Sequence, residues 1–117
     1  MGIDRRIDYI EFPAVSLEKA KQFYSGAFGW SFQDYGPDYC AFHDGGLDGG
    51  FYRAPLRATA SEGSALVVLY ADDLEATRGR VTEHGGTIVK EIFSFPGGRR
   101  FHFADPNGNE LAVWSER

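Results

Sequence analysis

The order of structural signals in the first half of this chain recurs in its second half. Residues 7–30, IDYIEFPAVSLEKAKQFYSGAFGW, and residues 64–87, SALVVLYADDLEATRGRVTEHGGT, each read as a β-prone run, a short cap, a helix and a glycine-marked exit. An offset of 57 positions aligns Leu17 with Leu74, together with several apolar neighbours. Because a repeat of this length is one supersecondary unit, the sequence predicts a duplicated module.

Helical spacing follows the first β-prone run in each half. In the first half Ser16 is the predicted N-cap, apolar side chains recur at helical intervals, and Gly29 closes the helix. In the second half Asp72 or Asp73 caps a helix that ends at residues 85–86. The two helices therefore occupy corresponding places in the two modules.

Short β-prone runs separated by turn residues fill the rest of each half. The clearest is the stretch 101–114, FHFADPNGNELAVW, where residues 105–109 supply proline and glycine for a tight turn between two strands. Each half thus predicts a βαβββ module, at about residues 1–56 and 64–117, with a linker at about residues 57–63. We expect one α+β domain over the whole chain, with the two modules forming a curved mixed sheet around an open cleft.

Charge and composition exclude several classes of function. The formal net charge is −5 and the pI is near 5.1, whereas nucleic-acid binding needs a basic surface. No apolar run is long enough for a transmembrane helix, and the first residues contain no apolar signal core. The lone cysteine, Cys40, rules out a disulfide within the chain. We expect a cytoplasmic protein that acts on a small molecule, with no nucleic-acid or membrane partner.

Three stretches of the sequence resemble one known superfamily. They are residues 9–30, residues 69–89 with the motif LYADDLEATRGRVTEHGGTIV, and the hairpin of residues 101–114. In combination they are similar to the vicinal oxygen chelate superfamily, and closest to its small bacterial single-domain members. That superfamily includes glyoxalase I, extradiol dioxygenases, bleomycin- and fosfomycin-resistance proteins and methylmalonyl-CoA epimerase. The resemblance implies the paired βαβββ fold and a homodimer.

The resemblance also implies where a metal would bind. Metal enzymes of the superfamily hold a divalent ion with His, Glu or Gln side chains from four strands. Three of those positions fall here on Tyr9, Leu66 and Ala112, and the fourth falls within residues 49–55, which contain no carboxylate, His or Gln. Leucine and alanine offer no lone pair to a cation. We therefore expect no cofactor and no metal at the usual position.

Strand alternation predicts which polar side chains line the cleft instead. It places Tyr9 and Glu11 on the cleft side, and a symmetric hairpin turn places His102 there too. Glu11 is the candidate general base, because a carboxylate in an apolar strand needs a partner or a role. The alternative for Glu11 is a salt bridge to Arg53 or Arg100, or a hydrogen bond to a tyrosine.

His102 is a second candidate for acid–base catalysis, with a core or surface histidine as the alternative. Glu11, His102 and Glu110 together form a non-standard metal set if all three converge.

The aromatic side chains of the predicted strands are candidate ligand contacts. Tyr9, Phe51, Tyr70 and Trp114 would form a wall that stacks on a planar ligand, or would simply pack in the core. We predict a glyoxalase- and bleomycin-resistance-like protein that binds a small, aromatic molecule in the cleft. The alternatives are a glyoxalase-like lyase or isomerase using Glu11, a dioxygenase-like enzyme, or a structural dimer whose cleft is filled by its own side chains.

Overall fold

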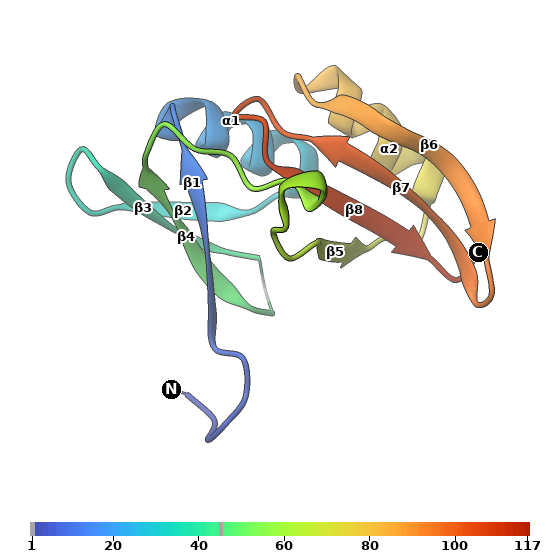
Figure 1. Ribbon diagram of the computed structural model, residues 1–117, viewed down its shortest axis with the longest axis horizontal. Helices are drawn as coiled ribbons and strands as arrows, with labels where there is room; N and C mark the ends of the chain where they lie inside the picture. Colours follow the sequence, from blue (N-terminus) through green and yellow to red (C-terminus); the bar gives the residue numbers. More distant parts are fainter. Residues whose placement is uncertain (1, 45) are drawn as a thin grey trace.

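Two four-stranded sheets, each with one helix packed on it, make up the protein (Figure 1). The computed structural model describes residues 2–44 and 46–117. In chain order the elements are β1 (Tyr9–Ala14), α1 (Leu17–Phe28), β2 (Ser31–Asp34), β3 (Tyr39–His43), β4 (Asp48–Arg53), the short 3₁₀ helix η1 (Ala60–Glu62), β5 (Val67–Tyr70), α2 (Leu74–Glu83), β6 (Thr87–Phe95), β7 (Gly98–Ala104) and β8 (Glu110–Ser115).

The two sheets repeat one topology. Sheet A has the strand order β1-β4-β3-β2, and sheet B has the order β5-β8-β7-β6. β1 runs parallel to β4 and β5 runs parallel to β8, while the remaining pairs are antiparallel. A parallel pair requires a crossover connection, which contains α1 in the first half and α2 in the second. The predicted α+β fold of two βαβββ modules is confirmed, and β1 and β5 are sheet edges.

The starts of both helices and the end of α1 agree with the sequence prediction, whereas α2 ends at Glu83, before the expected residues 85–86. The Ser16 hydroxyl accepts a hydrogen bond from the Lys19 amide at 3.2 Å. Gly29 ends α1 with φ +75°, a conformation that glycine adopts without strain. For α2 the structure selects Asp73 over Asp72, because the Asp73 carboxylate accepts from the Ala76 amide at 3.0 Å. The capping signals therefore identified the start of α1 and narrowed the start of α2 to two neighbouring residues.

One aromatic core lies between the helices and the sheets. Within sheet A, the Phe12 and Phe51 rings stack at 5.5 Å. The Phe23 ring of α1 lies 5.8 Å from that of Phe103 in β7, so the first helix packs against the second sheet as well. The two modules therefore share a hydrophobic core.

The turn between β7 and β8 joins distant segments. The side-chain nitrogen of Asn109 donates to the Pro13 carbonyl at 2.8 Å, and its side-chain oxygen accepts from the Ala58 backbone amide at 2.8 Å. The Asn107 side chain makes two hydrogen bonds to the backbone of Ser16, at 2.8 and 3.0 Å. A stretch that the sequence marks as a turn therefore also binds the linker and the start of α1 to sheet B.

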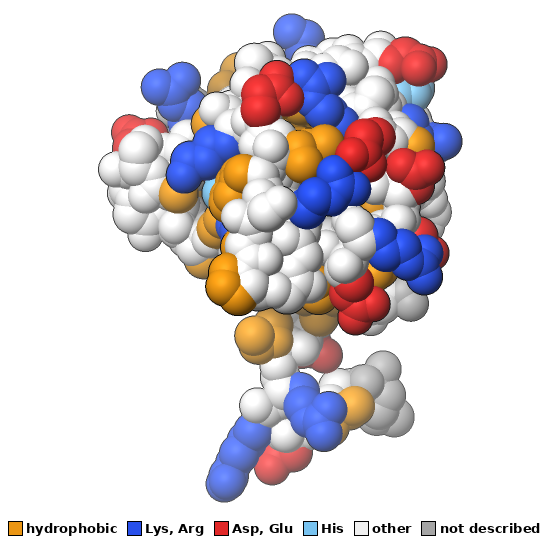
Figure 2. Space-filling view, turned by 90° about the vertical axis from the view of Figure 1, so that its right-hand side faces the viewer, with side chains coloured by type: hydrophobic (Ala, Val, Ile, Leu, Met, Phe, Trp, Pro, Cys, Tyr) orange, Lys and Arg blue, Asp and Glu red, His pale blue; other side chains and the backbone are white. Residues whose placement is uncertain are grey.

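The chain enters β1 from a projecting segment. Residues 2–8 extend away from the body of the molecule (Figures 1 and 2), and the strand expected from Ile7 begins at Tyr9. On the face in Figure 2, positive and negative side chains are interspersed around smaller apolar patches. No helix in the described part of the chain is both long and apolar enough to cross a membrane.

Candidate functional site

An apolar groove runs between the two sheets, with a volume of about 680 Å³. We call it the inter-sheet groove. Residues of β1 and β3 form one side, β5 and the residues before it form the other, and the end of α1 contributes as well. The lining residues used below are Ile10, Phe28, Trp30, Leu66, Val68 and Tyr70. Small-molecule sites typically enclose about 300–1,000 Å³ and are largely apolar, so this groove has the size and character of one.

Packed aromatic rings support the groove on the sheet A side. The Trp30 ring stacks on Phe42 at 4.4 Å and on Tyr24 at 4.6 Å. These rings belong to the hydrophobic core, which holds them in place from behind. A ligand in the groove would meet a preformed aromatic surface. Of the four aromatic side chains predicted as ligand contacts, Tyr70 is among the lining residues of this groove.

The face of sheet A that points away from the helix carries a hydrogen-bonded chain of three side chains. The hydroxyls of Tyr9 and Tyr39 lie 2.6 Å apart, and the Tyr39 hydroxyl donates to Glu11 Oε2 at 2.8 Å. Gly50 makes room for this arrangement, because a Cβ there would meet the Tyr39 hydroxyl. Burial, and then the hydrogen bonds to Tyr9 and Glu11, raise the pKa of Tyr39. The phenol therefore stays protonated and acts as a donor.

Glu11 lies on the predicted face but in different surroundings. Its side chain is exposed, so the carboxylate stays in contact with solvent. The alternative partner, a tyrosine, is the one present. Alternation identified the Glu11 side of the strand but missed Tyr39, which β4 separates from β1. Its position follows only once β3 is known to pair with β4. The role of Glu11 as a general base remains a prediction.

The corresponding face of sheet B holds a buried polar cluster. His102 lies opposite Ala112, which confirms the register predicted for the hairpin. His102 Nδ1 lies 3.3 Å from Glu110 Oε2, and Arg100 Nε donates to His102 Nε2 at 3.1 Å. Burial lowers the pKa of His102, and the nearby cations Arg100 and Lys90 add to this while Glu110 opposes it. A neutral imidazole with its proton on Nδ1 satisfies both contacts.

The predicted aromatic wall is only partly assembled. Tyr70 and Trp114 lie together on sheet B, edge to face at 5.0 Å. Tyr9 stands on sheet A. Phe51 is 0% exposed and packs among Phe12, Phe42 and Tyr24. Its expected place in the ligand wall is corrected, because it points to the helix side of β4.

The residues present do not fit the metal site of the superfamily. Of the three ligand positions implied by resemblance, Tyr9, Leu66 and Ala112, the last two carry no donor atom. The alternative set is not assembled, since Glu11 lies on sheet A while His102 and Glu110 lie on sheet B. Within residues 2–44 and 46–117, no three His, Cys, Asp or Glu side chains are grouped to hold a metal ion.

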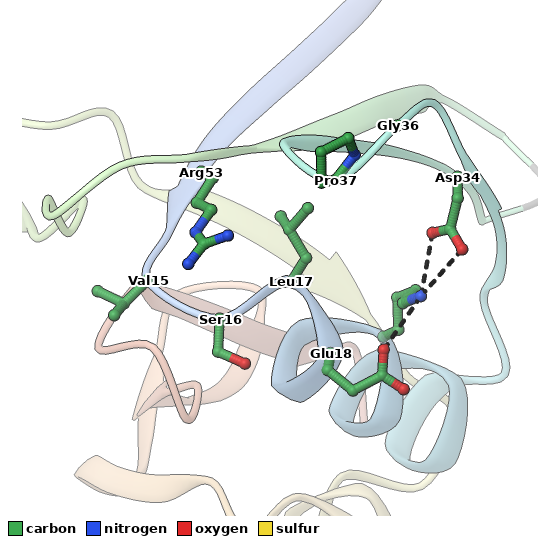
Figure 3. A pocket seen from close by; sticks show the side chains of 9 residues that line it. Val15, Ser16, Leu17, Glu18, Asp34, Gly36, Pro37 and Arg53 are labelled. Atoms are coloured by element: carbon green, nitrogen blue, oxygen red, sulfur yellow. Dashed lines mark hydrogen bonds and ion pairs between the residues drawn. The ribbon is translucent and has the colours of Figure 1, made fainter.

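A second hollow, of about 470 Å³, lies at the start of α1 (Figure 3). Its charged groups neutralise one another: the Lys21 ammonium lies 3.0 Å from Asp34 and 3.2 Å from Glu18. Arg53 also lines it and is exposed. Solvated ion pairs of this kind add little to stability and leave no strong charge for a ligand. The inter-sheet groove is therefore the better candidate site.

The fold and sequence match known proteins over nearly the whole chain. The family model described as the glyoxalase/bleomycin resistance protein/dioxygenase superfamily matches residues 6–113. A glyoxylase-like domain-containing protein of Didymella fabae is 30% identical, and the match covers 97% of this chain and 95% of that protein.

Solved structures share the fold at lower identity. The fosfomycin resistance protein FosX of Listeria monocytogenes has a TM-score of 0.80 at 14% identity, over 97% of this chain and 94% of that one. TnmS3, an antibiotic binding protein from a Streptomyces species, has a TM-score of 0.70 at 23% identity, over 98% of both chains. The paired modules, the motifs and the family match agree, and this chain belongs to the glyoxalase/bleomycin resistance protein/dioxygenase superfamily.

Proposed function

We propose that this protein binds a small, predominantly apolar molecule with an aromatic ring in the inter-sheet groove, without using the metal site of the superfamily. The observation that carries the proposal is the groove itself, whose volume is about 680 Å³ and whose lining includes Phe28 and Trp30. Aromatic side chains favour flat, apolar ligands, which they contact through stacked or edge-on rings. The antibiotic binding protein of similar fold supports a binding role.

The polarity of the groove narrows the ligand class. Asp44 is the acidic side chain among its lining residues, and one of its carboxylate oxygens accepts from the amides of Gly46 and Leu47 at 2.7 and 2.8 Å. No Lys or Arg lines the groove among the described residues. An anionic ligand would therefore find no countercharge there. The groove suits a neutral molecule, or one whose cationic end lies near Asp44.

The face of each sheet that points away from its helix is called here its open face. We also propose that two copies of the chain pair through exposed residues on these open faces. Tyr9, Val68 and Tyr70 are 42%, 41% and 45% exposed, although all three are large and apolar in character. A second copy that covered them would remove this surface from water. Size-exclusion chromatography with light scattering would measure the mass of the assembly.

Cys40 is buried in the core, which agrees with the cytoplasmic setting we propose.

A neutral apolar dye tests the groove directly. Nile red fluorescence should rise on binding and should be unchanged by a metal chelator. Val68→Lys places a charge at the groove wall, which an apolar ligand would have to desolvate, so dye affinity should fall about tenfold or more. Val89→Lys is the matched control, because Val89 is an exposed valine of β6 outside the groove lining.

Two results would refute this function. One is dye binding that Val68→Lys and Val89→Lys weaken equally, and the other is wild-type protein that binds no dye. A dye response that the chelator abolishes and added metal restores would show that a metal takes part after all.

A further inference from the structure

Within residues 2–44 and 46–117, no carboxylate forms an ion pair with Arg100, although its side chain is half-buried. The other arginines near it in sequence are paired: Arg78 donates to Glu91 at 2.8 and 2.7 Å, and Arg99 donates to Glu75. No carboxylate lies within 4.0 Å of the Arg100 guanidinium among the residues the structure describes. A partly desolvated guanidinium favours an anion, so this position differs from an ordinary surface arginine.

The hydrogen bonds of Arg100 leave the outer edge of its side chain available. Its Nε donates to His102 Nε2 at 3.1 Å, which fixes the inner edge of the guanidinium against sheet B. The two terminal amino groups make no hydrogen bond within the described part of the chain. Paired N–H groups in this planar arrangement match the two oxygens of a carboxylate.

Aromatic rings surround the guanidinium. Its Cζ atom lies 6.0 Å from the centroids of both Phe93 and Phe95. Trp114 is the register partner of Arg100 on β8, and Phe93 is its partner on β6. The Phe95 and Trp114 rings lie 6.2 Å apart. A planar group bound at Arg100 would therefore have an aromatic ring on each neighbouring strand, Trp114 on β8 and Phe93 on β6.

With Arg100, the charged groups on this face are two cations and two carboxylates, and neither carboxylate lies within 4.0 Å of Arg100. Lys90 pairs in register with His102 and adds a second cation. Glu110 is occupied: its oxygens contact His102 Nδ1 at 3.3 Å and accept from the Ala60 amide at 3.1 Å. Glu116 lies at the edge of the face, where the Tyr70 hydroxyl contacts it at 3.4 Å. The face as a whole therefore has no net positive charge, and an anion would be attracted by the guanidinium of Arg100 itself.

We propose that the open face of sheet B binds an aromatic carboxylate, because it places the free edge of Arg100 between Trp114 and Phe93. The carboxylate accepts two hydrogen bonds from the terminal amino groups of Arg100, and the ring lies against Trp114. This site is separate from the inter-sheet groove, since Arg100, Phe93 and Trp114 do not line that groove. The two sites therefore take ligands of different charge.

Isothermal titration calorimetry with benzoate tests the proposal. Wild-type protein should bind benzoate more tightly than benzamide, which has the same ring without the charge, and more tightly than acetate, which has the charge without the ring. Arg100→Gln should weaken benzoate at least about tenfold, as expected for loss of hydrogen bonds to a charged group. Arg53→Gln removes an exposed cation at the α1 hollow and should leave benzoate affinity unchanged.

Two further variants keep the test decisive if Arg100→Gln unfolds. Arg100→Lys keeps the charge but loses the paired donors, so it should weaken benzoate by less than Arg100→Gln does. Trp114→Leu should weaken benzoate and leave acetate unchanged. Nile red binding in each variant reports on the groove separately, so failure here and failure of the proposed function give different results.

Absence of benzoate binding to the wild-type protein would overturn the proposal. Equal loss in Arg100→Gln and Arg53→Gln, or equal affinity for benzoate and benzamide, would overturn it as well.

Discussion

Tyr24→Phe should destabilise the protein through the loss of one buried hydrogen bond. Tyr24 is 0% exposed and Asp105 is 4% exposed, and the Tyr24 hydroxyl donates to Asp105 Oδ2 at 2.8 Å. The substitution removes one oxygen and leaves the ring in place. A hydrogen bond to a charged group contributes about 1.5–3 kcal/mol, so the free energy of unfolding should fall by about that amount at neutral pH. For a chain of this length the midpoint should fall by about 6–12 °C.

The effect should depend on pH in a definite direction. Burial raises the pKa of Asp105 above its ordinary value of 3.8, while the hydrogen bond from Tyr24 opposes that shift. The folded state therefore holds the Asp105 proton more tightly than the unfolded chain does. As a result, Asp105 makes the free energy of unfolding fall as the pH rises from its unfolded-state pKa to its folded-state pKa. Tyr24→Phe removes the hydrogen bond that lowers the pKa of Asp105, so this pKa rises further in the folded variant. The difference between wild type and variant should be largest at neutral pH and shrink on acidification.

Urea unfolding followed by circular dichroism at neutral and acidic pH measures both effects. Tyr35→Phe is the matched control, because Tyr35 is 58% exposed and its hydroxyl has no hydrogen bond among the described residues; it should unfold like wild type. A Tyr24→Phe protein within about 0.5 kcal/mol of wild type at neutral pH would contradict this reasoning, since that is the scatter of ordinary surface changes. So would a penalty that grows as the pH falls.

Three further predictions concern two glycines and the buried histidine. Gly79→Ala in α2 should raise the free energy of unfolding by about 0.5–1 kcal/mol, because a Cβ there meets nothing within 4 Å and alanine favours the helix. Gly98→Ala should lower it by about 1–3 kcal/mol, since a Cβ there would collide with the Ser115 carbonyl oxygen; urea unfolding of both variants checks the opposite signs. Glu110→Gln should lower the pKa of His102 further, because Glu110 is the group that raises it. An NMR titration of the imidazole measures this, and a pKa that rises would show that another group sets its charge.

Local sequence patterns predict most of the fold. Capping residues and glycines located both helices, and the repeat gave the order of elements. Alternation gave the side of β1 on which Glu11 stands, and the hairpin gave the pairing of His102 with Ala112. Each of these depends on residues close in sequence, or on pairing across one tight turn.

The candidate sites could not be predicted in the same way. The inter-sheet groove depends on how far β1 lies from β5, which no residue pattern in either strand specifies. Phe51 is an aromatic candidate for the ligand wall by residue type alone, but its position in β4 turns its ring toward the core. Arg100 was considered only as a partner for Glu11. Its lack of an acidic neighbour within the described part of the chain results from the packing of β6 and β8 beside β7, and it becomes visible only with tertiary structure.

The duplication explains why the two open faces differ so strongly. Corresponding strands hold corresponding positions, and the offset of 57 residues sets Glu11 of β1 against Val68 of β5. The first face consequently presents a carboxylate and two phenols, while the second presents Arg100, the His102–Glu110 pair and indole and phenyl rings. Since the backbone geometry is repeated, the difference in charge arises from a few side chains on each sheet. A ligand that reached both faces would be bound best if it carried a hydrogen-bond donor at one end and an anion at the other.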